Sequence, residues 1–219
     1  MNDREFDVIV WGATGFTGAL VAEYLQARYG FGGELRWAIA GRDDSKLADV
    51  RRAIGGGETS LAMLTADSFD QRSLGEMASR TRVIISTVGP YAKFGSALVA
   101  ACVHHGTDYC DLAGEAQWIR EMIDTHQDAA CESGARIVHC CGFDSVPMDI
   151  GAWFLQQEAM QRYGNYCDSI TMLVKATKGG PSGGTIASMM NVIRESREDR
   201  GIARILVDPY SLNPPDQRS

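Results

Sequence analysis

Residues 6–18 read FDVIVWGATGFTG, and this stretch decides the fold. The apolar run from Phe6 to Trp11 favours a strand that is buried on both faces. From Phe16 onward the pattern favours a helix instead. Its apolar positions include Phe16, Leu20, Val21, Tyr24 and Leu25. The chain must therefore turn sharply between a strand and a helix.

The turn contains three glycines at a spacing typical of a dinucleotide pyrophosphate site. Gly12 can adopt backbone angles closed to other residues, Gly15 leaves room for a phosphate, and Gly18 lets the helix approach the strand. The free amides and the dipole at the helix start favour an anion. No Lys-Ser or Lys-Thr pair follows the last glycine, so this is not an NTPase phosphate loop. The alternative is a tight turn that binds no ligand.

Composition limits the classes of protein to which the chain can belong. Its 219 residues, 45% hydrophobic and 22% charged, suffice for one domain and part of another. A net charge of -7 and a pI near 5.1 argue against nucleic acid or an anionic membrane as main partner. No apolar stretch approaches the roughly 18 residues of a membrane span, and from the charged start we expect no signal peptide. We expect a cytoplasmic protein without an integral membrane segment.

The six cysteines show no paired C-x-x-C spacing, so we expect reduced thiols. Cys102, His104, His105 and Cys110 lie close in sequence. Nothing completes a tetrahedral set around them, however, and no metal site is expected.

Strand and helix patterns alternate through the first two thirds of the chain. Strands are predicted at residues 6–11, 35–40, 59–64, 83–88, 109–112 and 136–141, with helices that include 69–78, 95–105 and 115–133. Six strands with helical crossovers predict an α/β fold, a doubly wound parallel Rossmann sheet in the order 3-2-1-4-5-6. We expect a cofactor-binding domain at residues 1–147.

Residues 148–219 are predicted to begin a second α/β domain. Asp144 and Ser145 are expected to cap a helix with Pro147 in its first turn. A strand is predicted at residues 169–176 and another helix from near Thr185. About seventy residues are too few for an independent core, so we expect this substrate domain to be truncated.

Ligands of such sheets bind at the carboxyl ends of the strands. The loop after the second strand is therefore expected to contact the cofactor. An NAD site would place an acidic residue there, whereas this chain has Gly41 followed by Arg42. Arg42 could bind the 2′-phosphate of NADP, with Ser45 and Lys46 as helpers. The alternative makes Arg42 a solvated loop residue and Asp43 a helix cap.

The loop after the fourth strand, residues 86–91, should pass beside the cofactor. Gly89 permits close approach, Pro90 stiffens the turn, and Tyr91 offers a hydroxyl. The alternative is an ordinary turn. Glu115 and Asp144, at later strand ends, are interpreted as candidate helix caps.

Four linked motifs run through these strand ends: GATGFTG at 12–18, AGRDDSKL at 40–47, STVGPYAKFGSALVAACVHHGTDYCDLAGE at 86–115 and CGFDSVPMDIG at 141–151. Together they resemble the saccharopine dehydrogenase-like oxidoreductase family, and within it the bacterial trans-acting enoyl reductases. The resemblance covers about residues 7–191. It implies a Rossmann domain, NADP(H) as cofactor and a larger mixed α/β substrate domain.

The resemblance also implies roles for individual residues, but no secure catalytic base. Members of the family are considerably longer than this chain. The second domain is a candidate for a homodimer contact.

The pyrophosphate residues that the resemblance implies are Gly12, Thr14, Gly15, Phe16 and Thr17. It also implies Arg42 on the 2′-phosphate, and Thr87, Val88, Gly89 and Tyr91 along the nucleoside and nicotinamide.

The leading functional hypothesis is an NADPH-dependent reductase. Hydride would move to an activated C=C bond, such as the β-carbon of an unsaturated acyl group in a lipid-like or other small-molecule substrate. Such an enzyme must hold both reactants at near-attack distance and stabilise a developing enolate. Tyr91 is the candidate hydrogen-bond donor. The amides of Gly183, Gly184 and Thr185 could form an anion pocket.

Two alternatives stay open. A saccharopine-type imine reductase would need an arginine cluster for its carboxylates. Arg194, Arg197, Arg200 and Arg204 instead recur at helical spacing among acidic residues, which indicates a solvated helix face and ranks this alternative lower. The other alternative is a sensor or interaction module that binds NADP(H) without oxidising it.

Overall fold

A six-stranded sheet with all neighbouring strands parallel forms the centre of the computed structural model, which describes residues 4–57 and 60–217. The strand order is β3-β2-β1-β4-β5-β6. The strands are β1 (Phe6–Trp11), β2 (Trp37–Gly41), β3 (Ala62–Thr65), β4 (Thr81–Ser86), β5 (Asp108–Asp111) and β6 (Ile137–Val138). This topology confirms the predicted doubly wound Rossmann fold.

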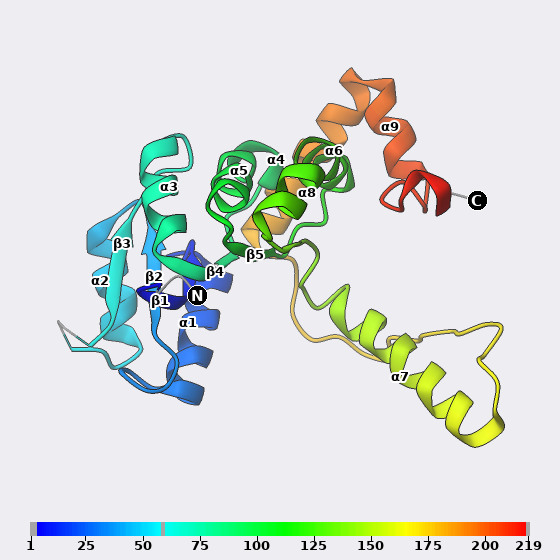
Figure 1. The fold of residues 1–219 in the computed structure, drawn as a ribbon, viewed down its shortest axis with the longest axis horizontal. Helices are drawn as coiled ribbons and strands as arrows, with labels where there is room; N and C mark the ends of the chain where they lie inside the picture. The colour runs from blue at the N-terminus through cyan, green and yellow to red at the C-terminus, as the bar shows by residue number, and fades with distance from the viewer. Residues whose placement is uncertain (1–3, 58–59, 218–219) are drawn as a thin grey trace.

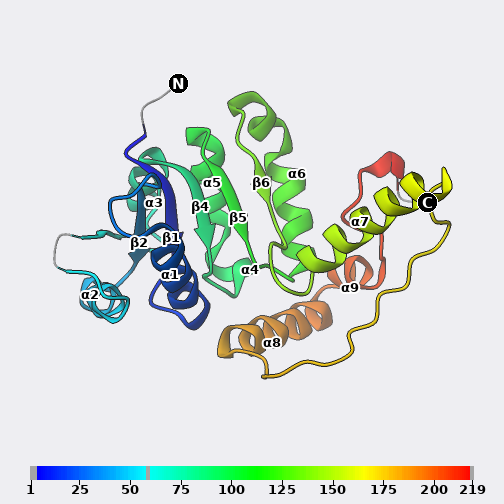
Figure 2. The same ribbon diagram turned by 90° about the horizontal axis from the view of Figure 1, so that it is seen from below.

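Helices cover both faces of the sheet (Figures 1 and 2). On one face, α1 (Phe16–Tyr29) and α2 (Asp44–Ala53) pack their buried residues against Val10 and Ile39. On the other, α3 (Gln71–Ser79), α5 (Ser96–His105) and α6 (Ala116–Ser133) enclose a core that includes Ile9 and Ile84. The short α4 (Tyr91–Phe94) precedes α5. The central strands are buried on both sides, as their β-branched residues predict.

Most expected elements are present with shifted ends. The sixth strand is shorter than predicted, with two residues in place of six. Within the third predicted strand, Thr59 lies outside the described residues. Asp43 caps α2, because its carboxylate accepts a hydrogen bond of 3.1 Å from the Lys46 amide. The cap at the start of α7 (Val146–Tyr163) differs from the prediction, since Ser145 holds the N-cap position without a side-chain bond.

Not all apolar positions of α1 are buried. Phe16 and Tyr24 have exposed fractions of 73% and 62%, whereas Gly18, Ala22 and Leu25 are the buried residues. Gly18 determines this rotation, because a Cβ there would lie 2.2 Å from the Gly12 carbonyl oxygen. Only glycine permits that approach. Ala22 and Leu25, four and seven positions later, lie on the same buried face of the helix as Gly18.

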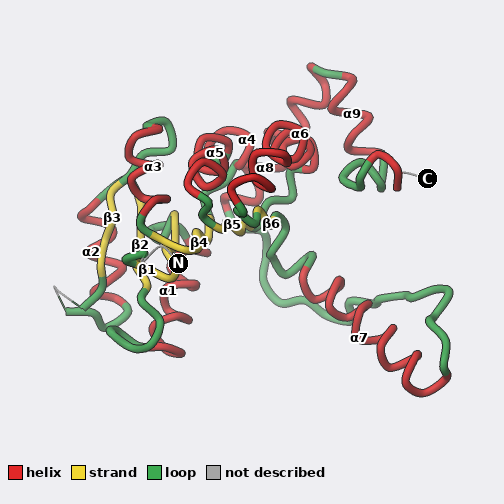
Figure 3. Tube along the Cα trace, viewed as in Figure 1, coloured by secondary structure: helices red, strands yellow, loops and turns green. Residues whose placement is uncertain are grey.

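Residues beyond the sheet form helices joined by a long loop (Figure 3). After α7 the chain returns through residues 164–182 to α8 (Gly183–Glu198), α9 (Arg200–Val207) and a 3-10 turn at Pro215–Gln217. The predicted strand at residues 169–176 is wrong, because this segment has no strand pairing and is largely exposed. The predicted helix near Thr185 is confirmed as α8. Among the described residues, no helix is long and apolar enough to cross a membrane.

Candidate functional site

The glycine turn between β1 and α1 forms an open cradle at the carboxyl edge of the sheet. Gly12 has a φ of 86°, which favours glycine. The N-cap residue Gly15 provides no side-chain cap. Among the described residues, the amides of Thr14, Phe16 and Thr17 have no hydrogen-bond acceptor. Free amides at a helix start, with the positive end of the helix dipole, favour an anionic group.

The loop after β4 lies directly against this turn. The Thr87 hydroxyl donates a hydrogen bond of 3.0 Å to the Trp11 carbonyl oxygen. A Cβ on Gly12 would lie 2.6 Å from Cγ2 of Val88, so these two loops leave room only for glycine at that position. Trp11 itself is a core residue, with an exposed fraction of 1%.

The loop after β2 also reaches the glycine turn. A Cβ on Gly41 would lie 3.6 Å from Cγ2 of Thr14, which is ordinary contact distance. Arg42 follows at once and is exposed, as are Ser45 and Lys46 in the first turn of α2. Lys46 Nζ lies 3.9 Å from the Asp43 carboxylate in an exposed pair, which contributes little to holding the lysine. The strand ends of β1, β2 and β4 therefore meet at one edge.

Tyr91 is held inside the protein by its hydroxyl. That hydroxyl donates to the Ser86 carbonyl oxygen at 3.1 Å and accepts from the Leu112 amide at 3.2 Å. Burial raises the pKa of Tyr91 well above its ordinary value. The ring also stacks on Trp118, with centroids 5.5 Å apart. This geometry gives no support to Tyr91 as a hydrogen-bond donor to substrate and shows it fixing the β4 and β5 loops together.

Glu115 has a role that the sequence interpretation missed. As a candidate cap of its own helix, α6, it makes no side-chain cap bond. Its buried carboxylate instead accepts hydrogen bonds from the amides of Tyr91 (2.7 Å) and Ala92 (3.0 Å), at the start of α4. It also accepts one of 2.9 Å from the Ser188 hydroxyl on α8. No local pattern indicates partners so distant in sequence.

Asp111 ties the ends of β5 and β6 together. Its buried carboxylate accepts hydrogen bonds from the amides of Ala113 (2.9 Å) and Cys140 (3.2 Å) and lies 2.7 Å from Nδ1 of His139. The Asp111 carboxylate therefore binds protein groups and joins the segments that follow β5 and β6.

Two other expectations need correction. The amide of Thr185, predicted as part of an anion pocket, donates to the Ser182 hydroxyl, which caps α8. The four arginines expected on one helix face belong to two helices, because α8 ends at Glu198 and α9 begins at Arg200.

Comparison with known proteins agrees with this architecture. Residues 8–138 match the family described as the saccharopine dehydrogenase NADP binding domain. A solved structure of saccharopine dehydrogenase (L-Glu forming) from Saccharomyces cerevisiae superposes with a TM-score of 0.57 at 17% identity, over 71% of this chain and 32% of that one. At this identity the likeness concerns the fold alone.

Sequence relatives include proteins named as trans-acting enoyl reductases. One from Mycobacterium tuberculosis is 45% identical over 211 residues, and one from Mycobacterium leprae is 39% identical over 212 residues. Each alignment covers 96% of this chain and 50% of the relative, so the chain spans about half the length of these relatives. The match over residues 8–138 shows that the chain belongs to the family of saccharopine dehydrogenase NADP binding domains.

Proposed function

We propose that the three strand ends around the start of α1 form one NADP(H) site. The observation that carries this proposal is the contact of the β1, β2 and β4 loops around helix amides that lack an acceptor among the described residues. The pyrophosphate would lie on these amides. The residues assigned to the site are Gly12, Thr14, Gly15, Phe16, Thr17, Gly18, Arg42, Ser45, Lys46, Thr87, Val88, Gly89 and Tyr91.

Arg42 is assigned to the 2′-phosphate of the cofactor. It is exposed at the end of β2, where an NAD-specific site would place a carboxylate and this chain has Gly41. A guanidinium can bind a phosphate through two parallel hydrogen bonds. Ser45 and Lys46 lie in the first turn of α2, directly after this loop, and are exposed.

We further infer that the protein reduces an activated C=C bond of an acyl substrate. The inference is supported by the relatives, which are named trans-acting enoyl reductases. This chain spans about half the length of those relatives. NADPH supplies the hydride when it is bound. The residues of this chain hold and orient the cofactor, while Glu115 and Tyr91 fix the loop that would lie along the nicotinamide.

The domain division stays a prediction. Residues 1–147 are assigned to cofactor binding, and the family match at residues 8–138 lies within them. Residues 148–219 are assigned to the substrate domain and to a homodimer contact.

The cofactor assignment is tested by titrating NADPH and NADH into wild type and Arg42→Ala by calorimetry. Loss of a charge-assisted phosphate contact should weaken NADPH binding by about 1.5 to 3 kcal/mol and leave NADH nearly unchanged. Arg52→Ala is the matched control, because Arg52 is exposed on α2 and pairs with Asp49 at 2.8 Å. Equal weakening of both nucleotides in Arg42→Ala would contradict the assignment.

The reaction is tested by following NADPH absorbance in the presence of α,β-unsaturated acyl thioesters. Consumption of NADPH supports enoyl reduction. Consumption only with an amino acid and a keto acid would favour the imine reductase, and NADPH binding without consumption would favour the sensor.

A further inference from the structure

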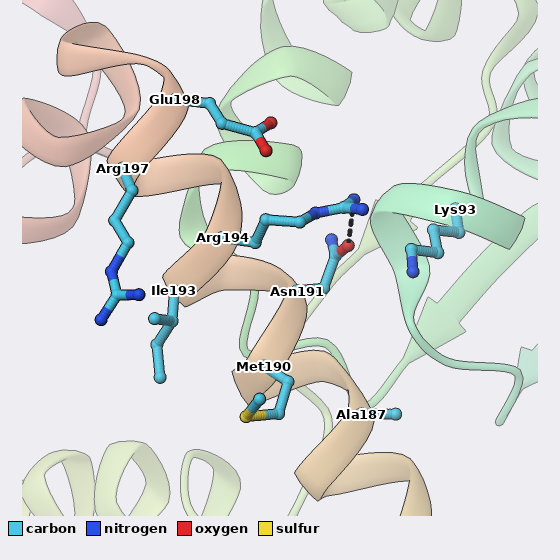
Figure 4. A pocket seen from close by; sticks show the side chains of 8 residues that line it. All are labelled: Lys93, Ala187, Met190, Asn191, Ile193, Arg194, Arg197 and Glu198. Carbon is cyan, nitrogen blue, oxygen red and sulfur yellow. Dashed lines mark hydrogen bonds between the residues drawn. The ribbon is translucent and has the colours of Figure 1, made fainter.

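A pocket of about 470 Å³ lies between α4 and α8 (Figure 4). Nothing in the proposed cofactor site uses it. Its lining combines three cations with apolar side chains and a single carboxylate. The lining residues are Lys93, Ala187, Met190, Asn191, Ile193, Arg194, Arg197 and Glu198.

Lys93 and Arg194 point toward one another across this pocket, from α4 and α8 respectively (Figure 4). Within the described part of the chain, neither side chain forms an ion pair with a carboxylate. Two facing cations repel one another, and an anion between them would remove this repulsion. The chain as a whole carries a net charge of -7, so a local positive site stands out against its surroundings.

The Arg194 guanidinium is held in place by a chain of neutral and acidic side chains. Its Nη2 donates to Oδ1 of Asn191 at 3.0 Å. Asn191 has an exposed fraction of 3% and donates through Nδ2 to Glu195 at 2.7 Å. Gln117 on α6 donates to the other Glu195 oxygen at 3.0 Å. Because Glu195 orients the Asn191 amide, the Asn191 oxygen faces Arg194 and the guanidinium is preorganised.

The pocket lies beside the loop expected to carry the nicotinamide. Lys93 is two residues beyond Tyr91, at the end of the Gly-Pro-Tyr turn. Ser188 on α8 bonds to Glu115, which holds the start of α4. A Cβ on Gly89 would lie 3.4 Å from the Ser188 hydroxyl oxygen, so α8 approaches this turn closely.

The other lining groups favour an alkyl chain next to the anion. Ala187, Met190 and Ile193 occupy one stretch of α8, and Met190 and Ile193 have exposed fractions of 64% and 41%. Figure 4 shows Arg197 pointing away from Lys93. A ligand that pairs with Lys93 and Arg194 could therefore also cover apolar surface of α8.

We propose that this pocket binds the anionic end of an amphipathic substrate, a carboxylate or phosphate joined to an alkyl chain. The proposal deepens the proposed acyl reduction and rests on it, because it places the substrate's charged end next to the nicotinamide loop. A guanidinium and an ammonium suit either oxyanion, so the experiment distinguishes the two.

The test is calorimetric titration of the NADPH-loaded protein with octyl phosphate and octanoate, in wild type, Lys93→Ala and Arg194→Ala. At least one of the two anions should bind, and each substitution should raise its dissociation constant about tenfold or more. Binding of octyl phosphate alone assigns a phosphate, and binding of octanoate alone a carboxylate. Arg204→Ala on α9 is the matched control and should bind as wild type does, since Arg204 does not line the pocket.

Titrations with octanol and with glutamate separate the contributions of the alkyl chain and of the negative charge, because octanol has only the chain and glutamate has carboxylates without a long alkyl chain. Either one binding as tightly as the amphipathic anions would overturn the proposal, as would failure of both anions to bind. NADPH titration of the same variants distinguishes the two proposals. If the wild type binds NADPH but neither anion, the pocket proposal alone is overturned. If the wild type does not bind NADPH, the proposed cofactor site is overturned.

Discussion

The Glu115 carboxylate accepts a hydrogen bond of 2.7 Å from the backbone amide of Tyr91, although 24 residues separate them. Glu115 follows β5, and Tyr91 begins α4 after β4. The carboxylate has an exposed fraction of 1%, and its two oxygens receive three donors, from Tyr91, Ala92 and Ser188. A buried charge with this many donors fixes the geometry of the elements that supply them.

Glu115→Gln should destabilise the protein and weaken NADPH binding. Glutamine has one acceptor oxygen in place of two, and its NH2 group would face a backbone amide donor. We expect a loss of about 2 to 3 kcal/mol in the free energy of unfolding, measured by urea denaturation.

Glu132→Gln provides the control for this substitution. Glu132 lies on the same helix and is exposed, so the change should stay within about 0.5 kcal/mol. Equal stability of the two variants would show that the Glu115 charge is not needed to hold the start of α4.

Gly18→Ala should disrupt the glycine turn. A Cβ at this position would lie 2.2 Å from the Gly12 carbonyl oxygen and 2.8 Å from the Ala13 Cα, both backbone atoms. Helix α1 would have to move away from β1, at a cost of about 3 kcal/mol or more, and NADPH affinity should fall with it. Thermal unfolding and nucleotide titration measure the two effects.

Gly114→Ala is the matched control, because a Cβ there would meet no atom of the described residues within 4 Å. Wild-type behaviour of Gly18→Ala would contradict the close packing of α1 on β1.

The central fold is predictable from sequence because its signals are local. The β-branched run ending at Trp11, the glycine turn and the Asp43 cap each act over a few residues. The contacts of Glu115 join three distant segments, and nothing within the segment around it indicates them. The alternating pattern at residues 169–176 is local too, but a strand needs a neighbouring strand for its hydrogen bonds, and the described residues supply none there.

Asp7→Asn should lower stability at neutral pH but not at low pH. Hydrogen bonds from Arg36, at 3.0 Å from its amide and 3.2 Å from Nη2, lower the pKa of Asp7. A carboxylate with a lowered pKa stabilises the folded state above its ordinary pKa of about 4, and this contribution disappears as the pH falls through the folded-state pKa. The difference from wild type should be about 1 kcal/mol or less at pH 7 and shrink below pH 4.

Urea denaturation at pH 7 and pH 3 measures this difference. Asp49→Asn is the control, since Asp49 belongs to an exposed pair with Arg52 on α2 and should change stability little at either pH. A pH-independent effect of Asp7→Asn would mean that packing, rather than charge, accounts for the loss.

Ser188→Ala should loosen α8 from the sheet-bearing part of the molecule. The Ser188 hydroxyl donates to Glu115 at 2.9 Å, and its removal leaves both backbone amides still bound to that carboxylate. We expect a loss of about 1 kcal/mol and faster amide hydrogen exchange in α8, with little change in exchange at Tyr91. Ser196→Ala is the control on the same helix, because the Ser196 hydroxyl donates to the Ile193 carbonyl oxygen within α8 itself. Unchanged exchange in Ser188→Ala would show that other contacts, such as Gln117 with Glu195, hold α8 on their own.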